Sequence, residues 1–188
     1  MQAPWKAIGR FVWKHWPSTA LLILVIAFIM TPHRLERFFV YYPIKELAGD
    51  PSNVGLTYQD LNIVTEDRVR VHGWFVPCAG ARRAFLIFHG NAGNVSHRLS
   101  WIELLHELKA HVMIIDYRGF GRSEGRPFED GLYRDARAAY NWWRKERSAT
   151  GEKLILIGES LGSAVAVDLA AREPVAGIVL QSAFTSAW

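Results

Sequence analysis

Four short apolar runs alternate with longer stretches of helical character over residues 84–180, and this alternation restricts the possible fold more than any other feature of the chain. The runs are AFLIFH at 84–89, VMIID at 112–116, KLILI at 153–157 and GIVL at 177–180. None of them alternates with polar residues, as a strand with one solvent-exposed face would. We therefore expect a mostly parallel sheet with helices covering both faces.

The segments between these runs are predicted to be helices. Within residues 94–109, apolar side chains recur at helical spacing, at Trp101, Leu104, Leu105 and Leu108. Further helices are expected at 128–147 and 160–172. Before the first run, residues 56–65 and 69–77 are rich in β-formers and are separated by Glu-Asp-Arg, which predicts a hairpin.

Charge is unevenly distributed along the 188 residues, whose net charge is +4 from 22 basic and 18 acidic side chains. Residues 1–45 hold six basic residues and one acidic residue, so the rest of the chain is close to neutral. A nucleic-acid-binding surface needs clustered basic charge on the folded domain, and we expect none here. Cys78 is the only cysteine, which excludes an intrachain disulfide and a thiolate metal site.

An uncharged apolar segment lies near the N-terminus, at residues 16–30 (WPSTALLILVIAFIM). It is slightly shorter than the roughly 20 residues that cross a bilayer, and tryptophans and basic residues flank it. We expect a single-pass anchor over residues 1–34, a linker at 35–55 and the catalytic domain at 56–188. A cleaved signal peptide and an apolar helix packed on the domain are the alternatives. The basic residues favour a cytoplasmic N-terminus and an extracytoplasmic domain.

The pentapeptide Gly-Glu-Ser-Leu-Gly at 158–162 stands between the strand KLILI and a predicted helix. A G-x-S-x-G turn in this position forces its serine, here Ser160, to project above the carboxyl edge of the sheet as a nucleophile. A Cβ at Gly158 or Gly162 would collide with the neighbouring strand or helix. The alternative is a plain strand–helix turn in which Ser160 only caps the helix.

A second glycine-rich turn, His89-Gly90-Asn91-Ala92-Gly93-Asn94, follows the strand AFLIF. A nucleophile elbow needs two N–H donors for the oxyanion of the tetrahedral intermediate, one after the nucleophile and one from this earlier loop. We assign these donors to Leu161 and Asn91, with Ala92 as the alternative to Asn91. Neither turn ends in Gly-Lys-Ser/Thr, which argues against a phosphate-binding loop.

These motifs together resemble the α/β-hydrolase superfamily. The resemblance rests on HGNAGN, DYRGFGRSEG (116–125), the predicted helix GLYRDARAAYNWW and GESLG, in that order, and covers about residues 35–187. Within this superfamily, the chain most resembles the serine aminopeptidase-like branch, and in that branch the small membrane-anchored α/β-hydrolase domain-containing proteins. The resemblance implies an α/β-hydrolase fold, a structural role for His89, Gly90, Asp116 and residues 118–121, and no cofactor.

The catalytic triad of such a fold runs Ser, then Asp or Glu, then His along the chain. The segment after GIVL, QSAFTS at 181–186, contains no carboxylate, and no histidine follows it. We therefore expect this chain to be truncated after about the sixth strand, so that it lacks the triad acid and base. Without an imidazole to take its proton, Ser160 would be a weak nucleophile.

Other histidines of the chain are weak candidates for a catalytic base or a metal ligand. His89 lies at the correct end of the sheet to act as a base, but its position in the motif favours a role in shaping the loop. His106 and His111 flank a possible zinc motif, HELKAH. They are five residues apart and so leave one helical face, unlike H-E-x-x-H, and we predict no metal site.

Two functions follow from these observations. The first is a serine hydrolase that acts on small acyl compounds (esters, thioesters or amides) and is impaired in this truncated chain. The second is a non-catalytic, membrane-anchored binding protein on a degenerate hydrolase fold. The acyl substrate cannot be read from the sequence.

Overall fold

The computed structural model describes residues 20–22, 25, 39–147, 151 and 153–184. The chain divides into two compact units, Met1–Phe39 and Val40–Trp188. Most of the predicted membrane anchor lies outside the described residues. Among those that are described, no helix combines the length and the apolar character needed to cross a bilayer.

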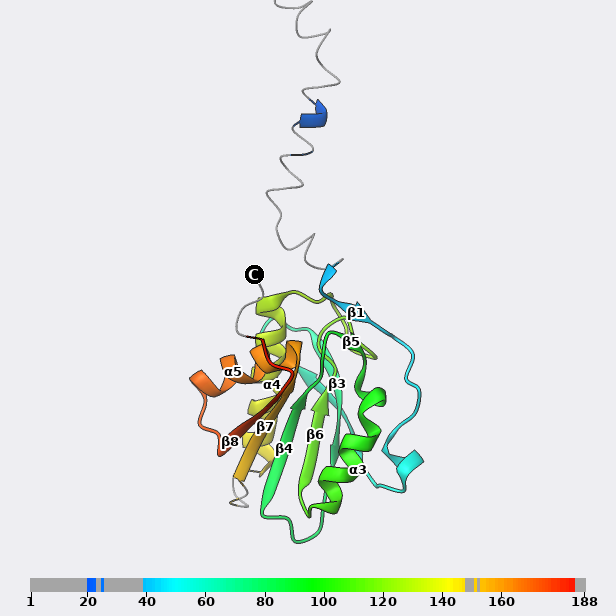
Figure 1. Cartoon of the computed structure of the whole chain (residues 1–188), viewed down its shortest axis with the longest axis vertical. Coiled ribbons are helices and arrows are strands. Elements are labelled where there is room, and N and C mark those ends of the chain that lie inside the picture. Colours follow the sequence, from blue (N-terminus) through cyan, green and yellow to red (C-terminus); the bar gives the residue numbers. More distant parts are fainter. Residues whose placement is uncertain (1–19, 23–24, 26–38, 148–150, 152, 185–188) are drawn as a thin grey trace, which may run out of the picture. The chain divides into compact units, whose positions relative to one another are not determined.

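The second unit is built on a six-stranded sheet with the order β2-β3-β6-β4-β7-β8 (Figure 1). β2 (Gln59–Val64) and β3 (Arg70–Val76) form the predicted antiparallel hairpin, and β3 also runs antiparallel to β6 (His111–Ile115). From β6 onward, β4 (Arg83–Phe88), β7 (Lys153–Glu159) and β8 (Gly177–Gln181) are parallel. The mostly parallel sheet predicted from the apolar runs is confirmed.

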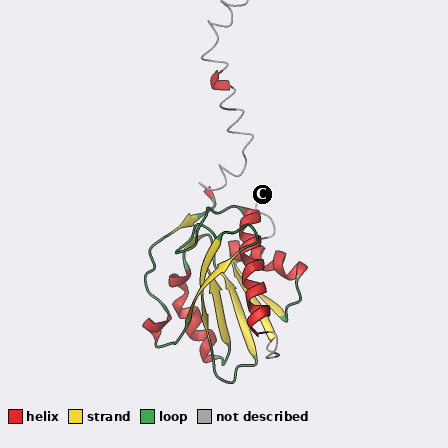
Figure 2. Cartoon of the chain, turned by 180° about the vertical axis from the view of Figure 1, so that it is seen from behind, coloured by secondary structure: helices red, strands yellow, loops and turns green. Residues whose placement is uncertain are grey.

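Helices cover both faces of this sheet (Figure 2). On one face α3 (Leu99–Glu107) contributes Ile102 and Leu105 to a core with β3, β4 and β6. On the other face, α4 (Glu129–Arg147) and α5 (Leu161–Arg172) pack over a second core. The strands lack polar alternation because each of their faces contacts one of these cores.

The predicted face of the first helix is wrong in part. Ile102 and Leu105 are buried, whereas Leu104 and Leu108 are 56% and 59% exposed. The helix also begins later than predicted, because residues Val95–Arg98 form a separate 3-10 turn, η2, that Asn94 caps.

Residues 40–55, expected as part of a linker, belong to the same compact unit as the sheet. β1 (Tyr42–Pro43) pairs in parallel with β5 (Ala92–Gly93), and η1 (Pro51–Val54) is a capped 3-10 turn. We call residues 40–48 the clasp. The clasp N–H groups of Tyr42 and Ile44 donate to the carbonyl groups of Asn91 and Gly93, so the clasp is bonded directly to the HGNAGN loop.

Candidate active site

Ser160 stands at a sharp turn between β7 and α5. Its backbone angles are φ 48° and ψ −112°, and a non-glycine residue rarely adopts such a positive φ. Two backbone hydrogen bonds maintain this strained conformation. The Ser160 N–H donates to the carbonyl of Gln181 at 2.8 Å, and its carbonyl accepts from the Ser163 N–H at 2.9 Å.

The two glycines of the turn lie against backbone. A Cβ at Gly158 would come within 2.5 Å of the Gly162 carbonyl oxygen, and a Cβ at Gly162 within 2.0 Å of the Phe88 carbonyl oxygen. Contacts this short require the strand or helix to move. Glycine at both positions therefore lets α5 approach the end of β4 closely.

Leu161 is the first residue of α5. The N–H at this position of a helix has no intrahelical acceptor. It also lies at the positive end of the helix dipole, where an anion is stabilised.

The HGNAGN loop and the Ser160 turn lie at the same edge of the sheet, because β4 and β7 are parallel and pair Phe88 with Gly158. Glu159 joins the two turns. Its carboxylate accepts from the Gly90 N–H at 3.2 Å and from Arg98 Nε and Nη2 at 2.9 and 2.8 Å. Arg98 and Glu159 are mostly buried, with 15% and 26% of their side chains exposed.

Three successive peptide groups of this loop have fixed orientations. The His89 carbonyl accepts from Tyr117 Oη at 2.9 Å, and the Gly90 carbonyl lies 2.8 Å from His89 Nδ1. The Asn91 carbonyl accepts from the Tyr42 N–H at 2.8 Å, and Asn91 Nδ2 donates to the Val40 carbonyl. Among the hydrogen bonds of the described residues, none uses the Asn91 N–H. The Asn91 N–H is therefore free of a partner among the described residues and could donate to a ligand.

His89 is fully buried against Tyr117 and Phe120, with ring centroids 4.6 and 5.2 Å away. The ring lies beneath the loop, with Nδ1 beside Gly90 and Nε2 3.5 Å from Asp116 Oδ1. No hydrogen bond joins the ring to Ser160 within the described part of the chain.

Asp116 and His72 form a buried pair that sequence reasoning missed. His72 Nδ1 lies 3.4 Å from Asp116 Oδ2, and His72 Nε2 lies 2.8 Å from Asp60 Oδ1. Burial alone would lower the pKa of His72, but the bonds to Asp116 and Asp60 outweigh it and raise this pKa above 6.5. Burial would likewise raise the pKa of Asp116, but His72 and His89 outweigh it and lower that pKa. The predicted hairpin placed His72 on a strand, but no sequence signal placed that strand next to the DYRGFG run; the pairing of β3 with β6 does so.

The remaining described histidines have local partners. His111 Nδ1 accepts from the Cys78 N–H, and His106 Nε2 lies 3.2 Å from the Pro77 carbonyl. His97 is an exposed residue of η2. In the described ranges, no group of three or more His, Cys, Asp or Glu side chains could hold a metal ion.

A comparison with protein families decides the identity of this fold. The profile of the family described as alpha/beta hydrolase fold matches residues 83–188, more than half of the chain. The chain belongs to the α/β-hydrolase family. The resemblance read from the four motifs is therefore confirmed at the level of family and fold.

Two curated relatives place this α/β-hydrolase among longer proteins. It is 39% identical over 173 residues to the uncharacterized protein Rv2307c of Mycobacterium tuberculosis. The aligned region covers 90% of this chain and 62% of the relative. It is 32% identical over 175 residues to the alpha/beta hydrolase domain-containing protein WAV2 of Arabidopsis thaliana, covering 87% of this chain and 56% of WAV2. The chain thus spans about three-fifths of the length of these relatives.

A solved structure shows the same fold. The esterase Pf2001 of Pyrococcus furiosus superimposes with a TM-score of 0.63 at 24% sequence identity, over 71% of this α/β-hydrolase and 52% of the esterase. At this identity the likeness concerns the fold alone.

Proposed function

We propose that this α/β-hydrolase is built for serine hydrolysis of small acyl compounds, with Ser160 as the nucleophile. The observation that carries the proposal is the pairing of the strained Ser160 turn with the HGNAGN loop at one edge of the sheet. Ser160 Oγ would attack the carbonyl carbon and give up its proton to a base. The Leu161 and Asn91 N–H groups would stabilise the negative oxygen that results.

We also propose that the 188-residue chain by itself reacts slowly. Among the described residues, the Ser160 hydroxyl has no hydrogen bond to a histidine, and each described histidine has a different partner or is exposed. A serine hydroxyl without a base to remove its proton is a poor nucleophile. Catalysis that remains without triad members is on the order of 10³–10⁴ over water and comes from the oxyanion hole and binding.

Labelling with a fluorophosphonate tests both parts. We expect labelling of the full chain near background, an increase of several-fold when free imidazole supplies the missing base, and no increase in Ser160→Ala. Labelling with imidazole that is equal in Ser160→Ala would overturn Ser160 as the nucleophile. Brisk turnover of a p-nitrophenyl ester without imidazole, abolished by Ser160→Ala, would show that the chain has its own base, and His89→Ala would then be compared.

The membrane anchor remains part of this proposal. The uncharged run at residues 16–30 supports it, together with the flanking tryptophans and basic residues. The domain would then lie on the extracytoplasmic side. We expect the expressed chain to stay with membranes during carbonate extraction, and its release into the supernatant would contradict the anchor.

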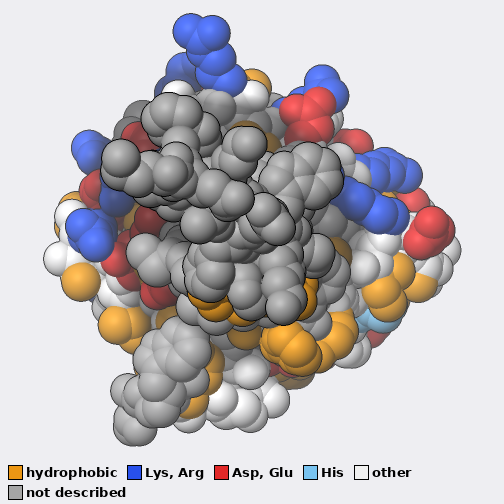
Figure 3. Space-filling view, turned by 90° about the horizontal axis from the view of Figure 1, so that it is seen from above, with side chains coloured by type: hydrophobic (Ala, Val, Ile, Leu, Met, Phe, Trp, Pro, Cys, Tyr) orange, Lys and Arg blue, Asp and Glu red, His pale blue; other side chains and the backbone are white. Residues whose placement is uncertain are grey.

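In the view from above, the visible side chains of the described residues include basic, acidic and apolar ones, with neither charge alone (Figure 3). A small acyl substrate suits such a face better than a polyanion does, because a nucleic acid requires concentrated basic charge.

A further inference from the structure

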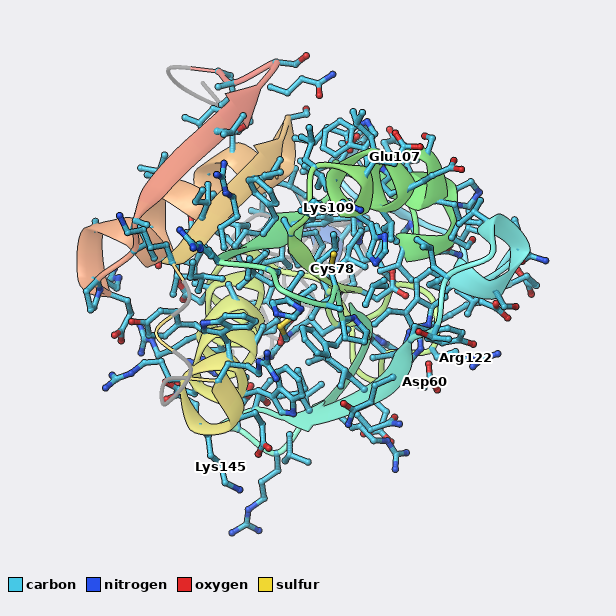
Figure 4. All side chains as sticks on the ribbon, turned by 90° about the horizontal axis from the view of Figure 1, so that it is seen from below. Asp60, Cys78, Glu107, Lys109, Arg122 and Lys145 are labelled. Carbon is cyan, nitrogen blue, oxygen red and sulfur yellow. The ribbon has the colours of Figure 1, made fainter. Side chains whose placement is uncertain are left out.

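A row of four side chains, one exposed and three buried, connects the protein surface to the HGNAGN loop. It begins at Asp60, which is 43% exposed and lies beside Arg122 (Figure 4). Asp60 contacts His72, which contacts Asp116, which contacts His89; the three distances are 2.8, 3.4 and 3.5 Å. His72, Asp116 and His89 are at most 1% exposed. Carboxylates and imidazoles alternate along this row.

The hydrogen positions at His89 follow from its neighbours. The Gly90 carbonyl oxygen can only accept, so His89 Nδ1, 2.8 Å away, must carry a proton. His89 Nε2 has no hydrogen-bond partner among the described residues, and Asp116 Oδ1 lies 3.5 Å from it. A bare ring nitrogen opposite a carboxylate would leave two lone pairs facing each other in a buried site, which is unfavourable. A proton held between these two atoms removes the conflict.

The orientation of His89 determines the orientation of Asn91. In a trans peptide the carbonyl and the next N–H point to opposite sides. Since the Gly90 carbonyl points to the buried His89 ring, the Asn91 N–H points away from that ring and from the core. This is the N–H that no hydrogen bond of the described residues uses.

We propose that Asp116, supported by His72, is a positioning residue for the oxyanion site. Asp116 keeps the His89 ring doubly protonated and correctly rotated, and the ring fixes the Gly90–Asn91 peptide. The inference rests on the proposed function, in which the Asn91 N–H receives the oxyanion.

The surroundings of Asp116 fit this role. Its Oδ1 accepts from the Val95 N–H at 2.9 Å, so the carboxylate also holds the residue that follows the loop. A Cβ at Gly121 would come within 2.0 Å of Oδ2, so Gly121 leaves the space that the carboxylate occupies. Of the other charged groups at the loop, Glu159 accepts from the Gly90 N–H and Arg98 donates to Glu159, so the contact does not pass through the ring.

Histidine-selective ¹⁵N NMR of the full chain in detergent micelles tests the proposal, with His89→Gln and His72→Gln to assign the ring signals. We expect both ring nitrogens of His89 to carry protons at neutral pH in the wild type. In Asp116→Asn we expect Nε2 to lose its proton and the Asn91 amide signal to shift. Asp168→Asn removes the charge of an aspartate that is bonded to Arg172 on α5 and lies without contact to His89, and it should leave these signals unchanged.

Two results would overturn the proposal: a bare Nδ1 or Nε2 in wild-type His89, or His89 and Asn91 signals that do not respond to Asp116→Asn. If Asp116→Asn does not fold, Asp60→Asn replaces it, because Asp60 is partly exposed and changes the same row from its outer end. Asp60→Asn should then shift the His72 and His89 ring signals, and unchanged His89 signals would count against the row. None of these readouts requires Ser160 to react, so they can fail or succeed independently of fluorophosphonate labelling.

Discussion

The loop after β6 contributes two charged side chains to the interior, and they differ in how fully they are bonded. Arg118 donates from its side chain to Asp135 and Asp67 in four hydrogen bonds of 2.8–3.0 Å, and its own N–H donates to Asp135 at 2.7 Å. Asp116, two residues earlier, has one bond of 2.9 Å from Val95 and two longer contacts to histidines, of 3.4 and 3.5 Å. We call these groups the Arg118 clamp and the Asp116 row.

The difference separates a structural role from a functional one. The Arg118 clamp joins the hairpin turn at Asp67 to α4 at Asp135, with Phe128 against the guanidinium, and contacts neither glycine-rich turn of the site. Four of the five N–H donors of the guanidinium are bonded to these carboxylates, so the clamp fixes one geometry. The Asp116 row ends at the HGNAGN loop and contains titratable rings with long contacts. The row contains two imidazoles, whereas the clamp contains a guanidinium and two carboxylates.

Replacing Arg118 should produce the largest effect. Arg118→Met leaves Asp135 buried without its cation, and breaking a buried pair in this way costs about 3–5 kcal/mol of unfolding free energy. Denaturant unfolding of the full chain, followed by circular dichroism, measures it; loss of the cooperative transition would be the extreme form of the same result. Arg122→Met is the matched control, because Arg122 is on the same loop but 62% exposed, and it should cost at most about 1 kcal/mol. Equal effects of the two changes would contradict the clamp.

The dependence of stability on pH should distinguish the two groups next. Burial raises the pKa of Asp135, the other carboxylate of the clamp, to about 6. The Arg118 hydrogen bond lowers the pKa of Asp67, so the Asp67 carboxylate stabilises the fold above the ordinary carboxyl pKa of 3.8 and loses this contribution as the pH falls. The pKa of Asp116 is also lowered, so its contribution to stability is likewise lost as the pH falls. His72 has the opposite sign: its pKa is raised, so its contribution is complete below 6.5 and is lost as the pH rises through the raised value.

Melting temperatures between about pH 6 and about pH 9 measure the difference at His72. We expect the wild type to lose stability with rising pH more steeply than His72→Gln does. Asp67→Asn, which alters the clamp, should keep the wild-type slope over this range. Equal slopes for wild type and His72→Gln would show that the row does not gain stability from a proton on His72.

The sequence allowed the sheet to be predicted better than the network behind the loop. Apolar runs such as AFLIF and KLILI are buried on two faces, so their composition alone indicates a parallel sheet. The clasp could not be predicted, because Tyr42 and Ile44 bind through backbone N–H groups that leave no mark on residue types. His72 and Asp116 are 44 residues apart, and only the pairing of β3 with β6 brings them together. Long-range side-chain contacts of this kind depend on strand order, which periodicity does not specify.

The smallest effect is expected at Glu159, where the HGNAGN loop is joined to the Ser160 turn. Glu159→Gln keeps an oxygen acceptor for the Gly90 N–H but removes the charge that pairs with Arg98. A partly buried bond of this type contributes about 1 kcal/mol, so hydrogen exchange at the Gly90 amide should accelerate by up to about tenfold while global stability changes little.

Asp168→Asn is the matched control. Asp168 also accepts from an arginine at 2.9 and 2.8 Å and is 17% exposed, but its partner Arg172 lies on α5 and not on the loop. Exchange at Gly90 should therefore be unchanged in Asp168→Asn. If both variants accelerate it equally, the effect comes from α5 as a whole, and Glu159 does not hold the two turns together.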